Sequence, residues 1–339
     1  MASCRSLLAA GLLAAAVLAA PVRSGATPSP SLPRSAGEGV ERPRTSAVPV
    51  ARGRAPSPPR GEGWGGAASR FLALASVGEG PGAALTGKDR FAAALAAGDR
   101  AFEARDDEAR LRDAIRAYGD AAAELPGEPR AELSLARAWL LLGAAAPRET
   151  PGACDAAARA SERALRALDP DFAAAVDRGD APEKALGAVK APAAAALYWF
   201  SLAALEGARA RGFAAVLAVR EAVRAGLQRA AALDERVDHG GPHRALGDLL
   251  AGLPTAAGGG AAAAREHFDR ALALAPDYQL TRVLEAERLA VLLQDRKLFD
   301  LRLAEVAGFD LAAAPALAPE NALARRLGAV LRKRADRLF

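Results

Sequence analysis

The sequence predicts an all-α protein in which antiparallel helix pairs form a tetratricopeptide-like α-solenoid, preceded by a disordered N-terminal segment. Three observations support this fold class. Alanine dominates and only 5% of residues are aromatic, and alanine favours helices and disfavours strands. From about residue 88, apolar residues recur at helical spacing between proline and glycine breaks. Several of these helices also end in similar alanine-rich stretches, as helix-pair repeats do.

Residues 1–26 have the pattern of a secretory signal peptide. Arg5 provides a basic start, residues 7–20 form an apolar run, and residues 24–26 are small. The run is too short to cross a bilayer core of about 30 Å. Cys4 precedes the run, whereas the lipidated cysteine of a lipoprotein signal follows it. We therefore expect export to the periplasm, cleavage near Ala26 and no acyl anchor.

Residues 27–87 are rich in proline, glycine and arginine and contain few large apolar side chains. Such a segment cannot bury enough surface to offset its ordering entropy, so we expect it to be disordered. The formal charge of +5 comes from residues 1–64, which hold eight arginines and three glutamates. Residues 65–339 are therefore neutral, with both signs mixed. This balance argues against nucleic acid as a partner, because a phosphate backbone attracts a basic face.

Residues 88–339 are predicted to form the helical domain, which begins with two hairpins. Phe91, Leu95, Gly98 and Phe102 lie on one helix face, and the same spacing returns over residues 111–125 before Pro126. A third helix is predicted around residues 135–143. A fourth begins with Thr150 as N-cap and Pro151 at the first helical position, and it ends at residues 169–170.

The remaining segments continue the helical pattern. Residues 171–190 are less regular, and the helices that follow are expected over residues 191–210, 213–233, 242–253, 260–275, 278–294 and 297–306. A last helix follows Pro319, with its apolar face formed by Leu323, Leu327, Val330, Leu331 and Leu338. The prediction amounts to eleven helices and no strand.

One helix end carries the spacing typical of a tetratricopeptide repeat. Ala264, Phe268, Ala271 and Pro276 match the small, aromatic, small and proline positions of such a repeat. This register predicts that Phe268 is buried between neighbouring helices.

No residue pattern indicates catalysis, a cofactor or a metal. His239 and His243 are four residues apart, but residues 240–242 are Gly-Gly-Pro, which excludes a helix that would join the two side chains. Carboxylates alternate with arginines, as at Glu285, Glu287 and Arg288, and we interpret them as solvated, ion-paired helix faces. Cys154 is interpreted as a small, buried helix residue. The sequence therefore predicts a protein that is not an enzyme.

Two clusters have both a binding and a packing interpretation. Tyr198 and Trp199 stand in an alanine-rich helix, and His243 and Arg244 follow the Gly-Gly-Pro turn. The aromatic side chains could line a pocket for a small apolar ligand, with His243 and Arg244 directed at it by the turn. Equally, Trp199 could fill the core and the turn could only connect two helix pairs. These four residues are the candidate ligand-binding or partner-binding residues.

Several motifs occur in one order along the chain. They are residues 196–199 (ALYW), 238–244 (DHGGPHR), 264–272 (AREHFDRAL), 294–299 (QDRKLF) and 319–324 (PENALA), with a weaker match at 101–107 (AFEARDD). Together they resemble the T component of tripartite ATP-independent periplasmic (TRAP) transporters, over residues 88–339. The resemblance implies a periplasmic helical protein that associates with the transporter's solute-binding protein and aids the uptake of a small solute, either apolar or an organic acid. It also implies homo-oligomers with a central opening and an apolar ligand cleft. The alternative is a general helical-repeat scaffold for protein–protein interactions in the cell envelope.

Overall fold

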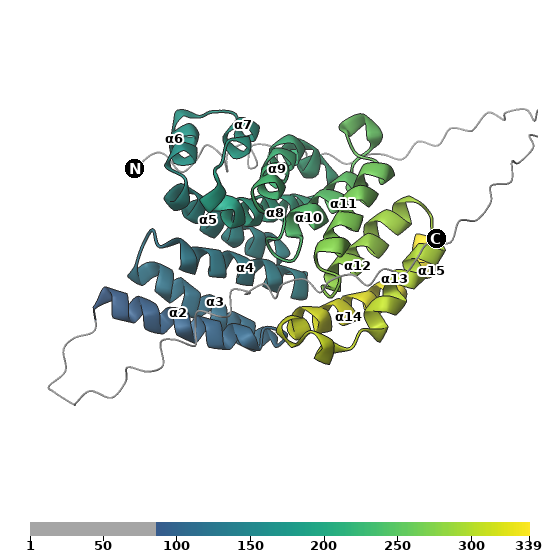
Figure 1. The fold of residues 1–339 in the computed structure, drawn as a ribbon, viewed down its shortest axis with the longest axis horizontal. Coiled ribbons are helices and arrows are strands. Elements are labelled where there is room, and N and C mark those ends of the chain that lie inside the picture. Colours follow the sequence, from purple (N-terminus) through teal and green to yellow (C-terminus); the bar gives the residue numbers. More distant parts are fainter. Residues whose placement is uncertain (1–85) are drawn as a thin grey trace, which may run out of the picture. The chain divides into compact units, whose positions relative to one another are not determined.

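The computed structural model describes residues 86–339, which fold entirely into helices (Figure 1). The predicted signal peptide and all but the last two residues of the predicted disordered segment lie outside the described residues. Within residues 86–339 there are fourteen α-helices, α2 to α15, together with short 3-10 turns and one π-helical segment, and no strand. The all-α prediction is confirmed, although the chain forms more helices than the eleven expected.

The first hairpin consists of α2 (Gly87–Glu103) and α3 (Glu108–Glu124), which pack against each other as predicted. Thr86 caps α2 in a capping box with Asp89, and Asp107 accepts hydrogen bonds from the first amides of α3. Gly98 lies directly under the ring of Tyr118, where a side chain would clash. The glycine in the apolar stripe of α2 thus permits close approach of the two helices.

The second hairpin joins α4 (Pro129–Ala145) and α5 (Thr150–Leu168). The prediction that Thr150 is an N-cap is wrong, because Thr150 is the first residue of α5 and no side chain caps the preceding position. Its hydroxyl instead donates to the carbonyl of Gly143, at 2.8 Å, and to that of Pro147. The threonine therefore satisfies a carbonyl at the end of α4, where helical partners are missing.

The irregular segment contains two short helices, α6 (Pro170–Arg178) and α7 (Pro182–Gly187). The long pair α8 (Ala194–Arg211) and α9 (Phe213–Asp234) follows, and Gly212 separates the two with a φ of 109° that favours glycine. Helix α8 packs between α5 and α9. Leu197 and several of its alanines, among them Ala196, Ala203 and Ala208, belong to a core that runs continuously from α2 to α10.

Helices α10 (Gly241–Gly252) and α11 (Ala261–Leu274) form the next pair. Phe268 is completely buried, as are Ala264 and Ala271. Its ring packs so closely on Gly247 that a Cβ there would lie 3.0 Å from it. The predicted burial of Phe268 is confirmed.

The C-terminal helices are α12 (Leu280–Glu285), a π-helical continuation (Ala286–Ala290), α13 (Arg296–Gly308), α14 (Ala318–Arg332) and α15 (Ala335–Leu338). The helix expected from Tyr278 begins at Leu280, because the amide of Gln279 donates to the side chain of Asn321 on α14, at 2.9 Å. These helices share a core of their own. Val330 was expected on the apolar face but is 58% exposed.

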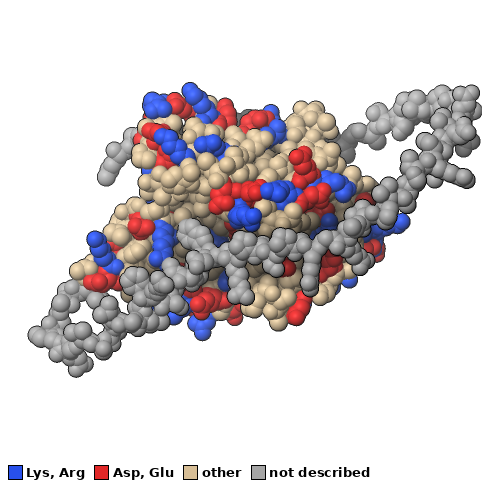
Figure 2. Space-filling model, in the orientation of Figure 1, with Lys and Arg blue, Asp and Glu red and all other residues tan. Residues whose placement is uncertain are grey.

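Charged side chains of both signs are interspersed on the face of the helical region in view (Figure 2). No continuous basic area covers the described residues on this face, in keeping with their balanced charge. Among residues 86–339, none of the helices combines the length and apolar character needed to cross a membrane.

Candidate ligand-binding site

A cavity of about 500 Å³ lies between helices α4, α5 and α8 on one side and α12 and α14 on the other. It follows the boundary between the large N-terminal core and the separate core of α12–α15. Apolar side chains form most of its wall, among them Leu140, Leu141, Trp199, Leu202, Leu280, Leu284 and Leu327. The volume and the apolar lining suit a small organic molecule.

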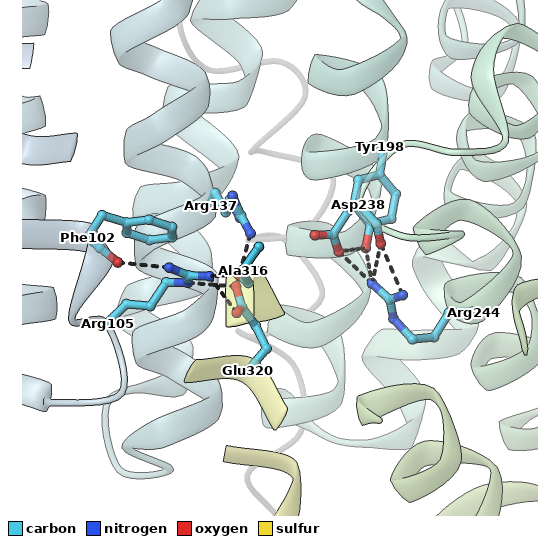
Figure 3. A network of polar contacts seen from close by, with 8 residues as sticks. All are labelled: Phe102, Arg105, Arg137, Tyr198, Asp238, Arg244, Ala316 and Glu320. Carbon is cyan, nitrogen blue, oxygen red and sulfur yellow. Dashed lines mark hydrogen bonds and ion pairs between the residues drawn. The ribbon is translucent and has the colours of Figure 1, made fainter. Parts of the chain in front are cut away.

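A network of buried charges, here called the polar cluster, forms one end of this cavity. It consists of Arg105, Arg137, Tyr198, Asp238, Arg244, Tyr278 and Glu320. Figure 3 shows its two halves side by side, one around Glu320 and the other around Asp238. Arg137 and Asp238 lie on the facing sides of these halves and both line the cavity.

The first half connects the beginning and the end of the helical domain. Glu320, in the first turn of α14, accepts two hydrogen bonds from Arg105 and one from Arg137 of α4, at 3.0 Å. Its side chain is only 3% exposed. An acidic residue suits this position, because the N-terminus of a helix carries partial positive charge.

The second half is built around the turn between α9 and α10. The carboxylate of Asp238 accepts from the hydroxyl of Tyr198, at 3.0 Å, and forms an ion pair with Arg244. Arg244 also donates to the backbone carbonyls of Asp238 and His239 and lies over the ring of Tyr278, 4.6 Å from its centroid. One guanidinium therefore holds the acid, the turn and an aromatic wall together.

This turn is conformationally unusual. Asp238, His239 and Gly240 have consecutive φ values of 47°, 58° and 76°, a region that residues other than glycine adopt at a cost. The hydrogen bonds from Arg244 hold the turn in place. Gly241 has no room for a side chain, since a Cβ would lie 2.5 Å from the ring of Tyr198. The Gly-Gly-Pro sequence thus lets the Asp238 carboxylate reach Tyr198 and Arg244.

Burial and neighbouring charges shift the ionisation of this cluster. Burial lowers the pKa of Arg137, but the nearby carboxylates of Asp238 and Glu320 outweigh this effect and raise it overall. Burial raises the pKa of the Tyr278 hydroxyl above its usual value, and Asp238 adds to the shift. The arginine is thus cationic and the phenol neutral at physiological pH.

The other end of the cavity contains a second group of charges. Arg209 of α8 and Arg288 of the π-helical segment both pair with the buried Asp248 of α10. Glu206 and Glu287 complete this group beside them. The exposed Arg334 also lines the cavity. From Trp199 to Glu206 is seven residues along α8, so an apolar stretch of roughly 10 Å separates the two charged ends.

Of the four predicted binding residues, two line the cavity and two do not. Trp199 and Arg244 line the cavity, whereas Tyr198 lies fully buried behind it and holds Asp238. His243 does not line it, so of the two residues that the binding interpretation directed at a ligand only Arg244 reaches the cavity. Because residues 243 and 244 are neighbours on α10, they point in different directions, and the Nδ1 of His243 lies 2.9 Å from that of His267.

Other sequence interpretations have mixed outcomes. Cys154 is buried as predicted, and burial raises its pKa to about 12. No set of three or more metal-binding side chains is brought together within residues 86–339. The interpretation of Glu285 as part of a solvated face is wrong, because it is fully buried and pairs with Arg302 of α13.

The sequence interpretation missed Arg137, Asp238 and Glu320 as site residues. Arg137 carried no signal, since it occurs in an ordinary amphipathic helix. Asp238 and Glu320 were both present in the motifs DHGGPHR and PENALA. An acidic residue two positions before a Gly-Gly pair and another in a helical first turn were the available signals.

The model of one protein family, the TRAP transporter T-component, matches residues 146–339. The chain belongs to this family. The predicted family is therefore confirmed, and the match includes Trp199, Asp238, Arg244 and Glu320 of the cavity. No curated protein matches the chain. A T component takes part in TRAP transport, so the protein is a transport-associated component.

Proposed function

We propose that this T component is exported to the periplasm, binds a small solute with an apolar body in its cavity, and associates reversibly with the solute-binding protein of its transporter. The observation that carries the proposal is the cavity of about 500 Å³, with Trp199 in its wall and a buried charged network at one end. If the side chains around Trp199 only packed the core, they would be expected to fill this volume. The family membership supports the role in TRAP transport.

The partner is proposed from the family and from the shape of the fold. Stacked helix pairs of a tetratricopeptide-like solenoid offer extended surfaces for another protein. Because charges of both signs are mixed on the face of the domain that Figure 2 shows, the contact should depend on shape and apolar patches more than on long-range attraction. We therefore expect modest affinity with weak dependence on salt. In addition to this association with the solute-binding protein, we propose that the T component forms homo-oligomers.

The test is calorimetric titration of the mature protein against the solute-binding protein of its transporter, with and without solute. We expect heat and co-elution. No heat and no co-elution up to about 100 μM, a limit near −5 to −6 kcal/mol, would favour a general scaffold in the cell envelope. A pull-down from the periplasm would then identify the partner of that scaffold.

Export has its own test. The mass of the secreted protein should place its N-terminus close to Thr27, without an added acyl group. A lipid mass, or a protein that keeps Met1, would contradict the proposed route to the periplasm.

A further inference from the structure

Two of the three histidines of the chain meet between helices α10 and α11, and neither lines the cavity. The Nδ1 of His243, in the first turn of α10, lies 2.9 Å from the Nδ1 of His267 on α11. The ring centroids are 5.2 Å apart and the ring planes are inclined by 36°. Both side chains are partly exposed, 16% in the case of His243, so a small ion in solution can reach the pair.

The partners of the two rings decide which nitrogens carry protons. Two Nδ1 atoms at this distance share one proton, because two lone pairs or two N–H groups would repel each other. On the other side of the His243 ring, Nε2 lies 3.4 Å from Oε2 of Glu235. A carboxylate favours an N–H on that nitrogen, so Nδ1 of His243 carries a lone pair and accepts from Nδ1 of His267. An ion that replaced the shared proton would meet a nitrogen lone pair from each ring.

Glu235 is itself held in place from its other side. Its carboxylate accepts a hydrogen bond from Nε of Arg270, at 2.9 Å, and forms an ion pair with a second nitrogen of the same guanidinium. Metal-bound imidazoles commonly donate their outer N–H to such a carboxylate, which fixes the tautomer and makes the inner nitrogen more basic. His243 therefore already has the surroundings of a metal ligand.

The spacing of the two rings suits a tetrahedral metal ion. Two imidazole nitrogens about 2.1 Å from Zn²⁺, at a tetrahedral angle, place their ring centroids about 5.3 Å apart. The observed centroid distance is 5.2 Å. The ion therefore fits once the rings tilt and the nitrogens separate to about 3.4 Å, with no change in the spacing of the helices. No third metal-binding side chain joins the pair within the described residues, so water would complete the coordination.

The charges around the pair also favour a cation. The charged side chains that act most strongly on His243 are Glu235, Arg270 and Glu266, two negative and one positive. Glu266 acts on His267 as well. Imidazole nitrogens suit Zn²⁺ and its transition-metal neighbours, whereas Mg²⁺ and Ca²⁺ prefer oxygen ligands. The expected ion is therefore a divalent transition metal.

We infer that His243 and His267 form a two-imidazole site for a divalent transition metal ion such as Zn²⁺, with Glu235 as the positioning residue. The ion takes the place of the hydrogen bond between the rings, and the displaced proton moves through water from Nδ1 to Nε2 of His267. The occupied site joins the first turn of α10 to the middle of α11, and so stabilises the helix pair that buries Phe268. It is separate from the cavity and does not depend on the proposed solute or partner.

The experiment is calorimetric titration of the mature, chelator-treated protein with Zn²⁺, without a polyhistidine tag and with Mg²⁺ as the comparison. We expect one Zn²⁺ per chain, no binding of Mg²⁺, and a higher melting temperature in the presence of Zn²⁺. In NMR spectra of ¹⁵N-labelled protein, the Nδ1 resonances of His243 and His267 should shift on binding. No Zn²⁺ binding up to about 100 μM, or shifts confined to other residues, would overturn the inference.

Variants separate this site from unspecific binding to imidazole. His267→Gln removes one ligand, so it should weaken Zn²⁺ binding at least tenfold and abolish the rise in melting temperature. Glu235→Gln should weaken binding about tenfold with one ion still bound. His239→Asn is the matched control, because it removes the third histidine and asparagine tolerates the positive φ at this position. It should bind like the wild type, and an equal loss in His239→Asn and His267→Gln, or no loss in His267→Gln, would overturn the inference.

Discussion

Arg105 and Glu320 are joined by two hydrogen bonds of 2.7 and 2.6 Å, although 215 residues separate them in the chain. The pair links the loop after the first helix of the domain to the start of α14. Helices α12–α15 have their own hydrophobic core, and α14 meets the N-terminal helices at the cavity through these charges. The position of α14 beside the cavity thus depends on a carboxylate that is almost completely buried.

Glu320→Gln should therefore destabilise the protein by about 3 kcal/mol, because it leaves the guanidinium groups of Arg105 and Arg137 without their buried anion. Denaturant unfolding monitored by circular dichroism measures the loss. Asp336→Asn is the matched control: its carboxylate is 98% exposed in a pair with Arg296, so the change should stay within about 0.5 kcal/mol. Equal effects of the two variants would show that the buried pair does not hold α14.

The tight packing at the Gly-Gly-Pro turn gives a second prediction. Gly241→Ala should cost about 1–3 kcal/mol, because its methyl group would meet the ring of Tyr198, which is fully buried and cannot move away. Gly119→Ala is the comparison, since a methyl group on this glycine of α3 would meet no other atom within 4 Å. It should stabilise the protein by about 0.5–1 kcal/mol through the better helix propensity of alanine. Thermal unfolding should show a lower melting temperature for Gly241→Ala and a higher one for Gly119→Ala than for the wild type. Equal melting temperatures would contradict the clash with Tyr198.

The burial of Phe268 predicts a cost of about 3–5 kcal/mol for Phe268→Ala. The lost ring would leave a cavity beside Gly247 that the surrounding helices cannot fill. Phe213→Ala, at a ring 53% exposed, should change the unfolding free energy by less than about 1 kcal/mol. A loss below about 1 kcal/mol for Phe268→Ala would mean that the ring contributes little to packing between the helix pairs.

The histidine pair predicts a pH dependence of stability. Burial lowers the pKa of both His243 and His267 below the ordinary value of 6.5. The unfolded chain then binds protons more readily than the folded one near pH 6, so their contribution is complete above about pH 7 and is lost as the pH falls below 6.5. Unfolding free energies at about pH 7.5 and pH 5.5 should show this decline. It should be smaller in a His243→Gln and His267→Gln double variant, and an unchanged decline would assign it to other groups.

Local patterns predicted the helices well and the charged end of the cavity poorly. Apolar periodicity and proline or glycine breaks depend on near neighbours, so α2 to α5 and α8 to α11 lie close to their expected ranges, whereas α6 and α7 lie in a segment for which no helix was specified. Arg244 was found because its turn is visible in the sequence. Arg137 and Glu320 were not, since a helical arginine or glutamate has the same local pattern whether it meets water or a partner 183 residues away. Only the folded chain distinguishes these two environments.

The single cysteine of the helical domain can be used to measure how often the cavity opens. Cys154 lines the cavity, is 1% exposed, and has a pKa of about 12, so it carries almost no thiolate at neutral pH. A thiol-reactive reagent can modify it only when a transient opening exposes its sulfur. The rate of alkylation therefore measures how often the resting molecule opens, without any engineered label. A solute that occupies the cavity would slow that reaction in proportion to its occupancy.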